Sequence, residues 1–301
     1  MLFKLHPTTV TFKDQYLLTQ SDVSAKMTDD VTEVVIENIT EIGELAFKYY
    51  EGLKSISSSV ESIGANAFLD CWNLEDVSFA EGSKLTTIGS YAFQSCGLKS
   101  ISIPPSVRTI GDYAFLQCYL PNISFAEGSN LTTIGDGAFA NCGFKTISIP
   151  SLVRSIGIMV FNLCRSLANI SFADGSKLTT IENHAFDSCG LKTISIPSSV
   201  GSIGNDAFDY CSNFENIFFE EWSNLTTIGT NAFRGCSNLK NISFKNQINL
   251  ITIPNDAFNE CSNLEMISFY GCIKLKSISI PSTIKYIDDY GFYNCSKLET
   301  I

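Results

Sequence analysis

The side chains best suited to chemistry in this sequence are eleven cysteines and two histidines. Ten of the cysteines follow a phenylalanine by three residues in a recurring motif, as in "IGANAFLDC" (63–71), and Cys272 lies outside this set. A zinc site needs close ligand pairs such as C-x-x-C, and the sequence contains none. A catalytic thiol needs one distinct cysteine with a histidine nearby, and ten equivalent cysteines do not single one out. We therefore assign no catalytic, metal-binding or cofactor-binding residue and expect no cofactor.

Two interpretations of the cysteines stay open, a packing role in the core and a redox or disulfide role. An odd number of cysteines without close pairs is unusual for an oxidised framework, whereas a buried thiol packs as a small hydrophobe. We favour packing and predict a structural ladder made by the phenylalanines and cysteines of successive motifs. Its members are Phe68, Cys71, Phe93, Cys96, Phe115, Cys118, Phe139, Cys142, Phe186 and Cys189.

Acidic residues recur in the turn sequences "FAEGS" and "FADGS", at Glu81, Glu127 and Asp174. Carboxylates in one column repel one another and would attract a cation. Ca²⁺ takes about six to eight oxygen ligands, however, and one carboxylate in each repeat supplies too few. We expect no metal site in these turns.

The spacing of the motif indicates a solenoid. Its marker phenylalanine recurs from Phe47 to Phe292 at steps of 21 to 25 residues, with a last step of 34. Short repeats such as "LKSISIPPSVRTIGDYAFLQC" (98–118) alternate with long ones such as "LPNISFAEGSNLTTIGDGAFANC" (120–142). Each begins with alternating apolar and polar residues, typical of a half-buried strand, and ends in a segment that we expect to be a short helical turn. One repeat, or rung, cannot bury its own apolar face, so the rungs must stack.

The domain organisation follows from where the repeat begins and ends. Residues 1–30 do not fit it, and we expect them to form an N-terminal cap in which "TVTFKDQYLLT" is a small strand or hairpin. The repeats fill residues 31–301, with an irregular rung expected near 262–290. The last residues, "CSKLETI", stop partway through a repeat. Because a repeat array normally ends in a polar cap, we expect the array to be truncated there, with room for a later membrane anchor.

The pattern L-x-x-I-x-I-P-x-x-V-x-x-I-G-x-x-A-F-x-x-C, as in "LKTISIPSSVGSIGNDAFDYC" (191–211), resembles the BspA-like class of leucine-rich repeats of bacteria and protists. The resemblance covers residues 31–301. It implies an α/β solenoid: a right-handed curved array with one long parallel β-sheet and short helical turns on the opposite side. For several members it also implies a cell-surface role in adhesion to host proteins or other microbes.

A partner-binding face is expected on the outward strand positions. Serine recurs there in nearly every repeat and lysine in alternate repeats. In "NIFFEEWSNL" (216–225), Phe218 and Trp222 stand where the preceding long repeats have Ser and Gly. The face can serve as a polar platform for a protein or glycan, with aromatic anchors. For any single residue we favour the alternative of a solvated sheet face, and for the two aromatic residues repeat drift stays open as an alternative. The candidate residues are Lys99, Ser102, Lys145, Ser148, Lys192, Ser195, Phe218 and Trp222.

Composition and charge limit the classes of binding partner and the cellular locations that we expect for this protein. The net charge of −11 disfavours nucleic acid, which needs clustered Lys and Arg. There is no apolar run long enough for a signal peptide or a membrane span. No enzyme motif stands apart from the repeats. We expect a non-enzymatic protein-binding protein, at the cell surface by resemblance or in the cytoplasm as a scaffold, with end-to-end self-association as a further option.

Overall fold

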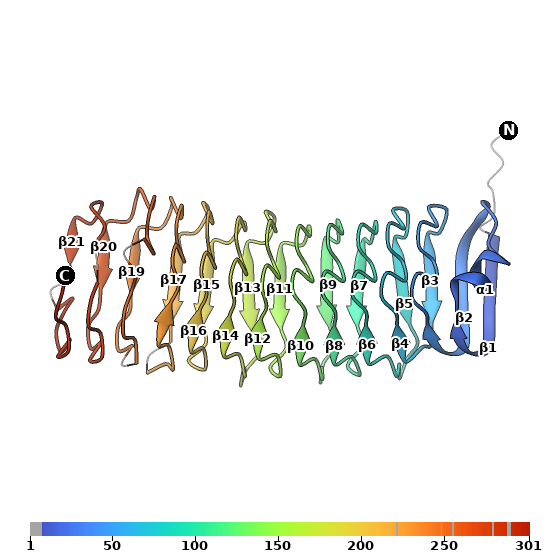
Figure 1. Cartoon of the computed structure of the whole chain (residues 1–301), viewed down its shortest axis with the longest axis horizontal. Helices are drawn as coiled ribbons and strands as arrows, with labels where there is room; N and C mark the ends of the chain where they lie inside the picture. The colour runs from blue at the N-terminus through green and yellow to red at the C-terminus, as the bar shows by residue number, and fades with distance from the viewer. Residues whose placement is uncertain (1–7, 221, 248, 255, 279, 288–289) are drawn as a thin grey trace. The chain divides into compact units, whose positions relative to one another are not determined.

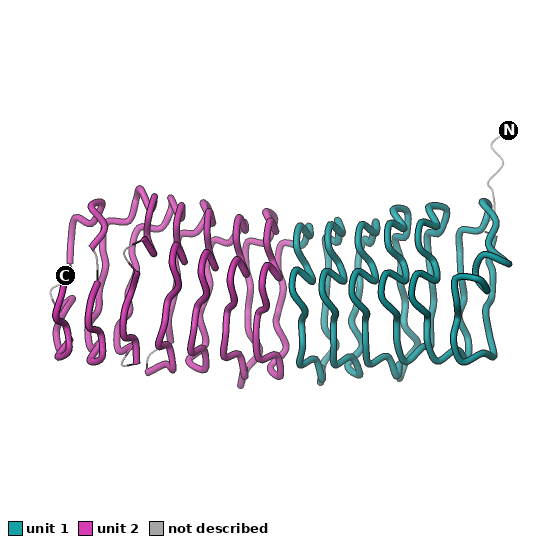
Figure 2. The backbone as a smooth tube through the Cα atoms, viewed as in Figure 1, with its two compact units in different colours: residues 1–144 teal, residues 145–301 magenta. Residues whose placement is uncertain are grey.

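The computed structural model describes residues 8–220, 222–247, 249–254, 256–278, 280–287 and 290–301. The chain divides into two compact units, residues 1–144 and 145–301 (Figure 2). Within each unit, short parallel strands pair with those of the neighbouring rungs (Figure 1). The parallel solenoid predicted from the repeat is confirmed.

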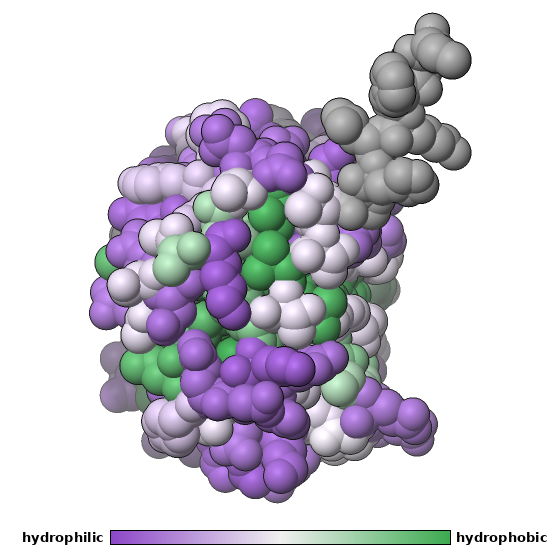
Figure 3. Space-filling view, turned by 90° about the vertical axis from the view of Figure 1, so that its right-hand side faces the viewer, coloured by the Kyte–Doolittle hydropathy of each residue, from purple (hydrophilic) through white to green (hydrophobic). Residues whose placement is uncertain are grey.

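Unit 1 begins with β1 (Thr8–Leu18), which pairs in parallel with β2 (Val31–Ile42). The segment expected as a strand or hairpin is thus one long strand; residues 1–7 of the expected cap lie outside the described residues. The short helix α1 (Gln20–Ser24) follows, with a capping box between Thr19 and Asp22. Viewed from the β1 end, apolar surface lies across the middle of the molecule between hydrophilic margins (Figure 3).

Two strand ladders leave β2, because its first half pairs with β3 and its second half with β4. The long-strand ladder consists of β3 (Ser55–Ser58), β5 (Asp76–Phe79), β7 (Ser100–Ile103) and β9 (Asn122–Phe125). The short-strand ladder consists of β4 (Ser62–Ile63), β6 (Thr87–Ile88), β8 (Thr109–Ile110) and β10 (Thr133–Ile134). The sequence predicted only the long strands.

Unit 2 repeats both ladders as separate sheets. The long strands are β11 (Thr146–Ile149), β13 (Asn169–Phe172), β15 (Thr193–Ile196) and β17 (Asn216–Phe219). The short strands are β12 (Ser155–Ile156), β14 (Thr180–Ile181), β16 (Ser202–Ile203) and β18 (Thr227–Ile228). A third sheet holds β19 (Asn241–Ser243), β20 (Met266–Ser268) and β21 (Tyr286–Ile287).

The segments expected as short helical turns are successive hydrogen-bonded turns, and α1 is the only helix in the described part of the chain. The Cys118 N–H donates to the Phe115 carbonyl within its rung at 3.1 Å. The Phe115 N–H instead donates to Ala138 of the next rung at 2.8 Å. Tyr113 and Gln117 have φ of 55° and 58°, so the chain reverses before a helix can propagate. The motif therefore forms a third line of hydrogen bonds between rungs.

The marker phenylalanines form a buried column in each unit. In unit 1 the rings from Phe47 to Phe139 stack with centroid distances of 5.1 to 5.5 Å. In unit 2 the rings from Phe161 to Phe258 stack over the same range of distances. Each ring is at most 3% exposed, and its burial contributes roughly 1.5–3 kcal/mol.

The last part of unit 2 departs from the earlier pairing. Thr252, Ser277 and Thr300 continue the short-strand ladder from Thr227 through single bridges, although "LKSISI" (275–280) reads as a long strand. Phe269 stacks between Phe244 and Phe292 at 5.5 Å from each, which starts a second phenylalanine column. The two halves of a rung can exchange places because both carry the same apolar spacing, L-x-x-I.

Cys272 does not stand apart from the other cysteines, contrary to the sequence interpretation. It follows Phe269 by three residues, and its thiol donates to the Phe244 carbonyl at 3.0 Å. Phe269 was missed because it also ends a strand sequence, "MISF" (266–269).

Candidate functional site

The outward side of the long strands is a column of exposed serines. In unit 1, Ser102 of β7 lies in register with Ser124 of β9. In unit 2, Ser148 of β11 is paired with Ser171 of β13, and Ser195 of β15 is paired with a phenylalanine, Phe218 of β17. The isoleucines that alternate with these serines are buried in β7, β11, β13 and β15, as expected from the period of two along a strand. The predicted serines thus share one face within each unit.

The lysines of this face differ in how their charge is balanced. Lys99 forms an ion pair with Glu75 of the preceding rung, and this hydrogen bond raises the pKa of Lys99. Lys145 and Lys192 are separated by one rung, since both bond through their backbone to Ala168. Among the described residues neither Lys145 nor Lys192 forms an ion pair. These two remain available to a partner, whereas Lys99 is already neutralised.

A groove runs beside the strand face in each unit. In unit 1 it has a volume of about 490 Å³ and is lined by Glu81, Ser100, Ser102 and Pro105, among others. The groove of unit 2 has about 380 Å³, and its lining includes Ser171, Asp174, Ser195, Pro197 and Glu220. Each lies between the turn of a long repeat and the proline turn of the following short repeat. The alternation of repeat lengths therefore produces the grooves, and each has an acidic residue on its wall.

Two exposed aromatic residues, Phe218 and Trp222, belong to the rung whose Glu220 lines the groove of unit 2. Phe218 is 57% exposed, and its strand partner Ser195 and its near neighbour Glu220 both line the groove. Trp222 is 63% exposed and has φ of 58°. The corresponding turns of the three preceding long repeats have glycine there, and Gly82 and Gly175 both have φ of 70° with nothing within 4 Å of an added Cβ. An L-residue in this region costs about 1–2 kcal/mol relative to its normal conformation, so the tryptophan is kept against a local strain.

Glu220 was not singled out from the sequence. Its carboxylate accepts a hydrogen bond from the Ser198 N–H at 2.8 Å, which joins the long-repeat turn to the proline turn across the groove. The long repeats at residues 120–142 and 167–189 have alanine at this position. The change from alanine to glutamate, two residues before Trp222, was the sequence signal that could have identified Glu220.

The ladder residues are buried, and their thiols have partners. Phe68, Phe93, Phe115, Phe139 and Phe186 are at most 1% exposed, and the cysteines Cys71, Cys96, Cys118, Cys142 and Cys189 at most 4%. Each of these thiols donates to the carbonyl of the phenylalanine in the preceding rung, at 2.8 to 3.1 Å. Burial raises the pKa of Cys71 and Cys118 to about 12. All eleven cysteines are free thiols.

In the described part of the chain, no group of three or more His, Cys, Asp or Glu residues is placed to hold a metal ion. The acidic turn residues Glu81 and Asp174 instead form parts of the two groove walls. No helix among the described residues is long and apolar enough to cross a membrane.

Comparison with known proteins identifies the repeat. A family model described as the BspA type leucine rich repeat region matches residues 19–128, 86–215, 172–268 and 264–301, in six copies. No curated protein sequence matches the chain.

Solved structures share this fold. The crystal structure of the pneumococcal vaccine antigen PcpA is 20% identical with a TM-score of 0.55, covering 90% of this chain and 88% of that one. A leucine-rich repeat protein from Bacteroides ovatus is 23% identical with a TM-score of 0.49, covering 90% and 92%. A leucine rich cell surface protein from Faecalibacterium prausnitzii is 26% identical with a TM-score of 0.43, covering 89% and 86%. Because the family model matches nearly the whole chain, this protein belongs to the BspA-type leucine-rich repeat family.

Proposed function

We propose that this protein is a non-enzymatic adhesion protein that binds a protein partner at the groove of unit 2, with Phe218 and Trp222 as its anchors. The observation that carries the proposal is Trp222, an exposed aromatic residue in a backbone conformation that corresponding turns give to glycine. Strain of this kind persists where the surrounding structure or a function maintains it. Large aromatic residues also dominate the binding energy of many protein interfaces.

The surroundings of the two aromatic residues fit a protein surface. The groove is lined by the hydroxyl of Ser195, which is the strand partner of Phe218, and by Glu220, which lies two residues before Trp222. Lys192 directly precedes β15 and carries an exposed charge. An apolar centre with a polar rim is the usual composition of such an interface.

The binding experiment removes the anchors without harming the fold. Phe218→Ser and Trp222→Gly restore the residues that other long repeats carry, so the double variant keeps or raises the free energy of unfolding. We expect it to bind immobilised extracellular-matrix proteins at least about tenfold more weakly than the parent chain. Trp72→Ser is the matched control, because Trp72 is 64% exposed but lies in unit 1. Equal binding by the double variant and the parent would remove the two aromatic residues from the proposal.

An intracellular scaffold is the second candidate, and the eleven free thiols favour it, since reduced cysteines are the rule in reducing compartments. Antibody labelling of the native protein separates the two. We expect intact cells to be labelled without permeabilisation. Labelling that requires permeabilisation would reject surface adhesion and support the scaffold.

A further inference from the structure

Another hollow lies in unit 2, among the A-F-x-x-C motifs and the turns that follow them rather than on the strand face. It has a volume of about 310 Å³, and its lining includes Arg165, Ser188, Gly190, Tyr210, Ser212 and Asn213. This volume is at the small end of the roughly 300–1,000 Å³ that small-molecule sites occupy. The proposed function makes no use of this site.

Two of the rungs that line the hollow meet in a close backbone contact at Gly190. A Cβ added to Gly190 would lie 2.1 Å from the Arg165 carbonyl oxygen and 3.4 Å from that of Leu167. No side chain fits at this position without moving the backbone. The glycine therefore lets its rung pack directly against the Arg165 carbonyl of the preceding rung.

Tyr210 forms a fixed aromatic wall. Its ring lies against Gly235, where an added Cβ would be 2.5 Å from Cδ1 of the tyrosine. The Arg234 guanidinium lies 5.3 Å from the ring centroid, and the hydroxyl donates to Glu260 Oε2 at 3.1 Å. Tyr210 is nonetheless 47% exposed. The ring is held in place before any ligand binds, which reduces the entropic cost of binding.

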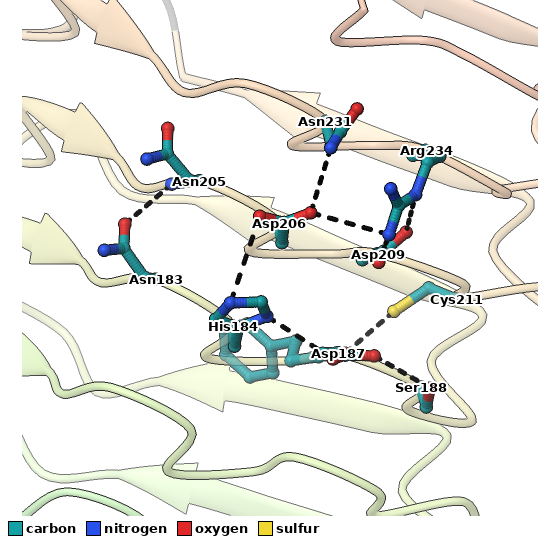
Figure 4. A network of polar contacts seen from close by, with 11 residues as sticks. Asn183, His184, Asp187, Ser188, Asn205, Asp206, Asp209, Cys211, Asn231 and Arg234 are labelled. Atoms are coloured by element: carbon teal, nitrogen blue, oxygen red, sulfur yellow. Dashed lines mark hydrogen bonds and ion pairs between the residues drawn. The ribbon is translucent and has the colours of Figure 1, made fainter.

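A polar network that includes Ser188 and Arg234 joins three successive rungs (Figure 4). Arg234 is held by Asp209, which is 3% exposed and accepts from Nε at 2.9 Å. Asp206 lies 3.6 Å from the same guanidinium and 3.9 Å from His184 Nε2. The positive charge of Arg234 is neutralised by these two carboxylates, so Arg234 positions Tyr210 and does not bind a ligand.

Ser188 connects this network to the hollow. Its hydroxyl donates to Asp187 Oδ1 at 2.8 Å, and the other carboxylate oxygen lies 3.4 Å from His184 Nδ1 (Figure 4). With its proton engaged, the Ser188 oxygen can accept a hydrogen bond from a ligand. Ser212 and Asn213 are exposed and can both donate and accept.

Arg165 supplies the charge of the hollow. It is exposed, and it forms no ion pair with any residue that the structure describes. A planar guanidinium matches a carboxylate through two parallel hydrogen bonds. Two carboxylates are bonded to residues that line the hollow, Asp187 to Ser188 and Glu260 to Tyr210, and they disfavour a ligand with many negative charges. The site therefore fits one carboxylate together with uncharged polar groups.

We propose that this hollow binds an acidic sugar residue, a uronic or sialic acid. The carboxylate pairs with Arg165, the apolar face of the sugar ring lies against Tyr210, and the hydroxyls bond to Ser188, Ser212 and Asn213. Serine and asparagine suit sugar hydroxyls because both partners donate and accept. A simple carboxylate would leave the aromatic wall and these polar groups unused.

The test measures binding of methyl glucuronide, the methyl glycoside of sialic acid, neutral methyl glucoside and acetate to the full chain by ligand-observed NMR. We expect at least one acidic glycoside to bind, and the glucoside and acetate to bind at least about tenfold more weakly. Arg165→Gln should weaken the acidic glycoside by a similar factor. Arg154→Gln is the matched control, because Arg154 is also exposed in unit 2 but lies outside the hollow.

Variants of the wall complete the test. Tyr210→Ala should abolish binding, whereas Tyr210→Phe should keep it, because the hydroxyl is bonded to Glu260. A thermal melt of each variant establishes that it is folded. The proposal is overturned if neither acidic glycoside binds, if acetate binds as well as they do, or if folded Arg165→Gln binds unchanged. Phe218→Ser with Trp222→Gly should leave sugar binding intact, so failure of either site is recognised separately.

Discussion

At the residue scale, the cysteine of each motif is a hydrogen-bond donor between rungs as well as a packing group. The Phe93 carbonyl accepts the Cys96 N–H of its own rung at 3.2 Å and the Cys118 thiol of the next rung at 2.8 Å. Cys118 is fully buried, so this carbonyl and thiol satisfy each other without water. The cysteine thus joins consecutive rungs through a polar contact inside the core.

This donor role makes a prediction for Cys118. Cys118→Ala removes the sulfur and the hydrogen bond and should lower the free energy of unfolding by about 1–3 kcal/mol. Cys118→Ser keeps a donor facing Phe93 and should cost less than the alanine variant. Urea unfolding of the three proteins measures the difference. If serine costs as much as alanine or more, the thiol hydrogen bond contributes nothing to stability.

Single residues of the candidate site were predictable where the repeat alone decides them. The outward serines and inward isoleucines follow from alternation along a strand. The pairing of Lys99 with Glu75 was not predicted, because it joins residues 24 apart that meet only when a short rung stacks on a long one. The hollow at Arg165 and Tyr210 was missed for the same reason, since its lining comes from three successive rungs.

At the element scale, the motif turns depend on residues in the left-handed region. Tyr113 and Gln117 have φ of 55° and 58°, and such residues recur in the turns of both units. Because the chain reverses at each of them, alternate N–H groups point to the next rung instead of closing a helix. The stack gains hydrogen bonds between rungs at the cost of local strain.

Glycine should relieve that strain where the side chain is exposed. Gln117→Gly removes about 1–2 kcal/mol of left-handed strain and adds about 0.5–1 kcal/mol of chain entropy, so the free energy of unfolding should rise slightly. Gln94 is the matched control, since its φ is not positive and glycine there brings only the entropy cost. Thermal melts should move in opposite directions for the two variants. A loss of stability in both would show that position 117 is not strained.

The elements missed by the sequence share a physical cause. The short strands have two residues each, which is too few for any periodicity to appear. The turns were expected as helical because Ala114, Phe115 and Cys118 have helical spacing, and tyrosine or glutamine gives no signal of positive φ. Glycine does give that signal, and the turns at Gly82 and Gly128 were correctly expected.

At the scale of the whole molecule, the cores of both units contain buried thiols that can ionise. Burial raises the pKa of Cys71, Cys118, Cys261 and Cys272 to about 12. In the unfolded chain a thiol has a pKa of about 8.5. Between these values the folded protein holds protons that the unfolded chain has released. The stabilisation is complete below pH of about 8.5 and is lost as the pH rises toward 12.

We therefore expect stability to fall steeply in mild alkali. Each of these four thiols contributes a loss of up to about 1.4 kcal/mol per pH unit above pH of about 9. Urea unfolding between pH 8 and pH 10, with a reductant present, measures the slope. Cys118→Ala should make this slope shallower by the contribution of one thiol, up to about 1.4 kcal/mol per pH unit. A free energy of unfolding that stays constant across this interval would contradict the buried, protonated thiols.

Because short and long rungs alternate, a pair of one short and one long rung is the segment that a gene duplication can copy as a whole. Phe68 and Phe115 are 47 residues apart, as are Phe161 and Phe208. Because contacts in a solenoid join neighbours only, a gene duplication that copies one such pair leaves every other contact unchanged. It also adds one complete groove beside the strand face. The number of grooves on the protein can therefore change in evolution by one groove per duplication. Each new copy can then acquire its own exposed aromatic residues, as the rung of Phe218 and Trp222 has done.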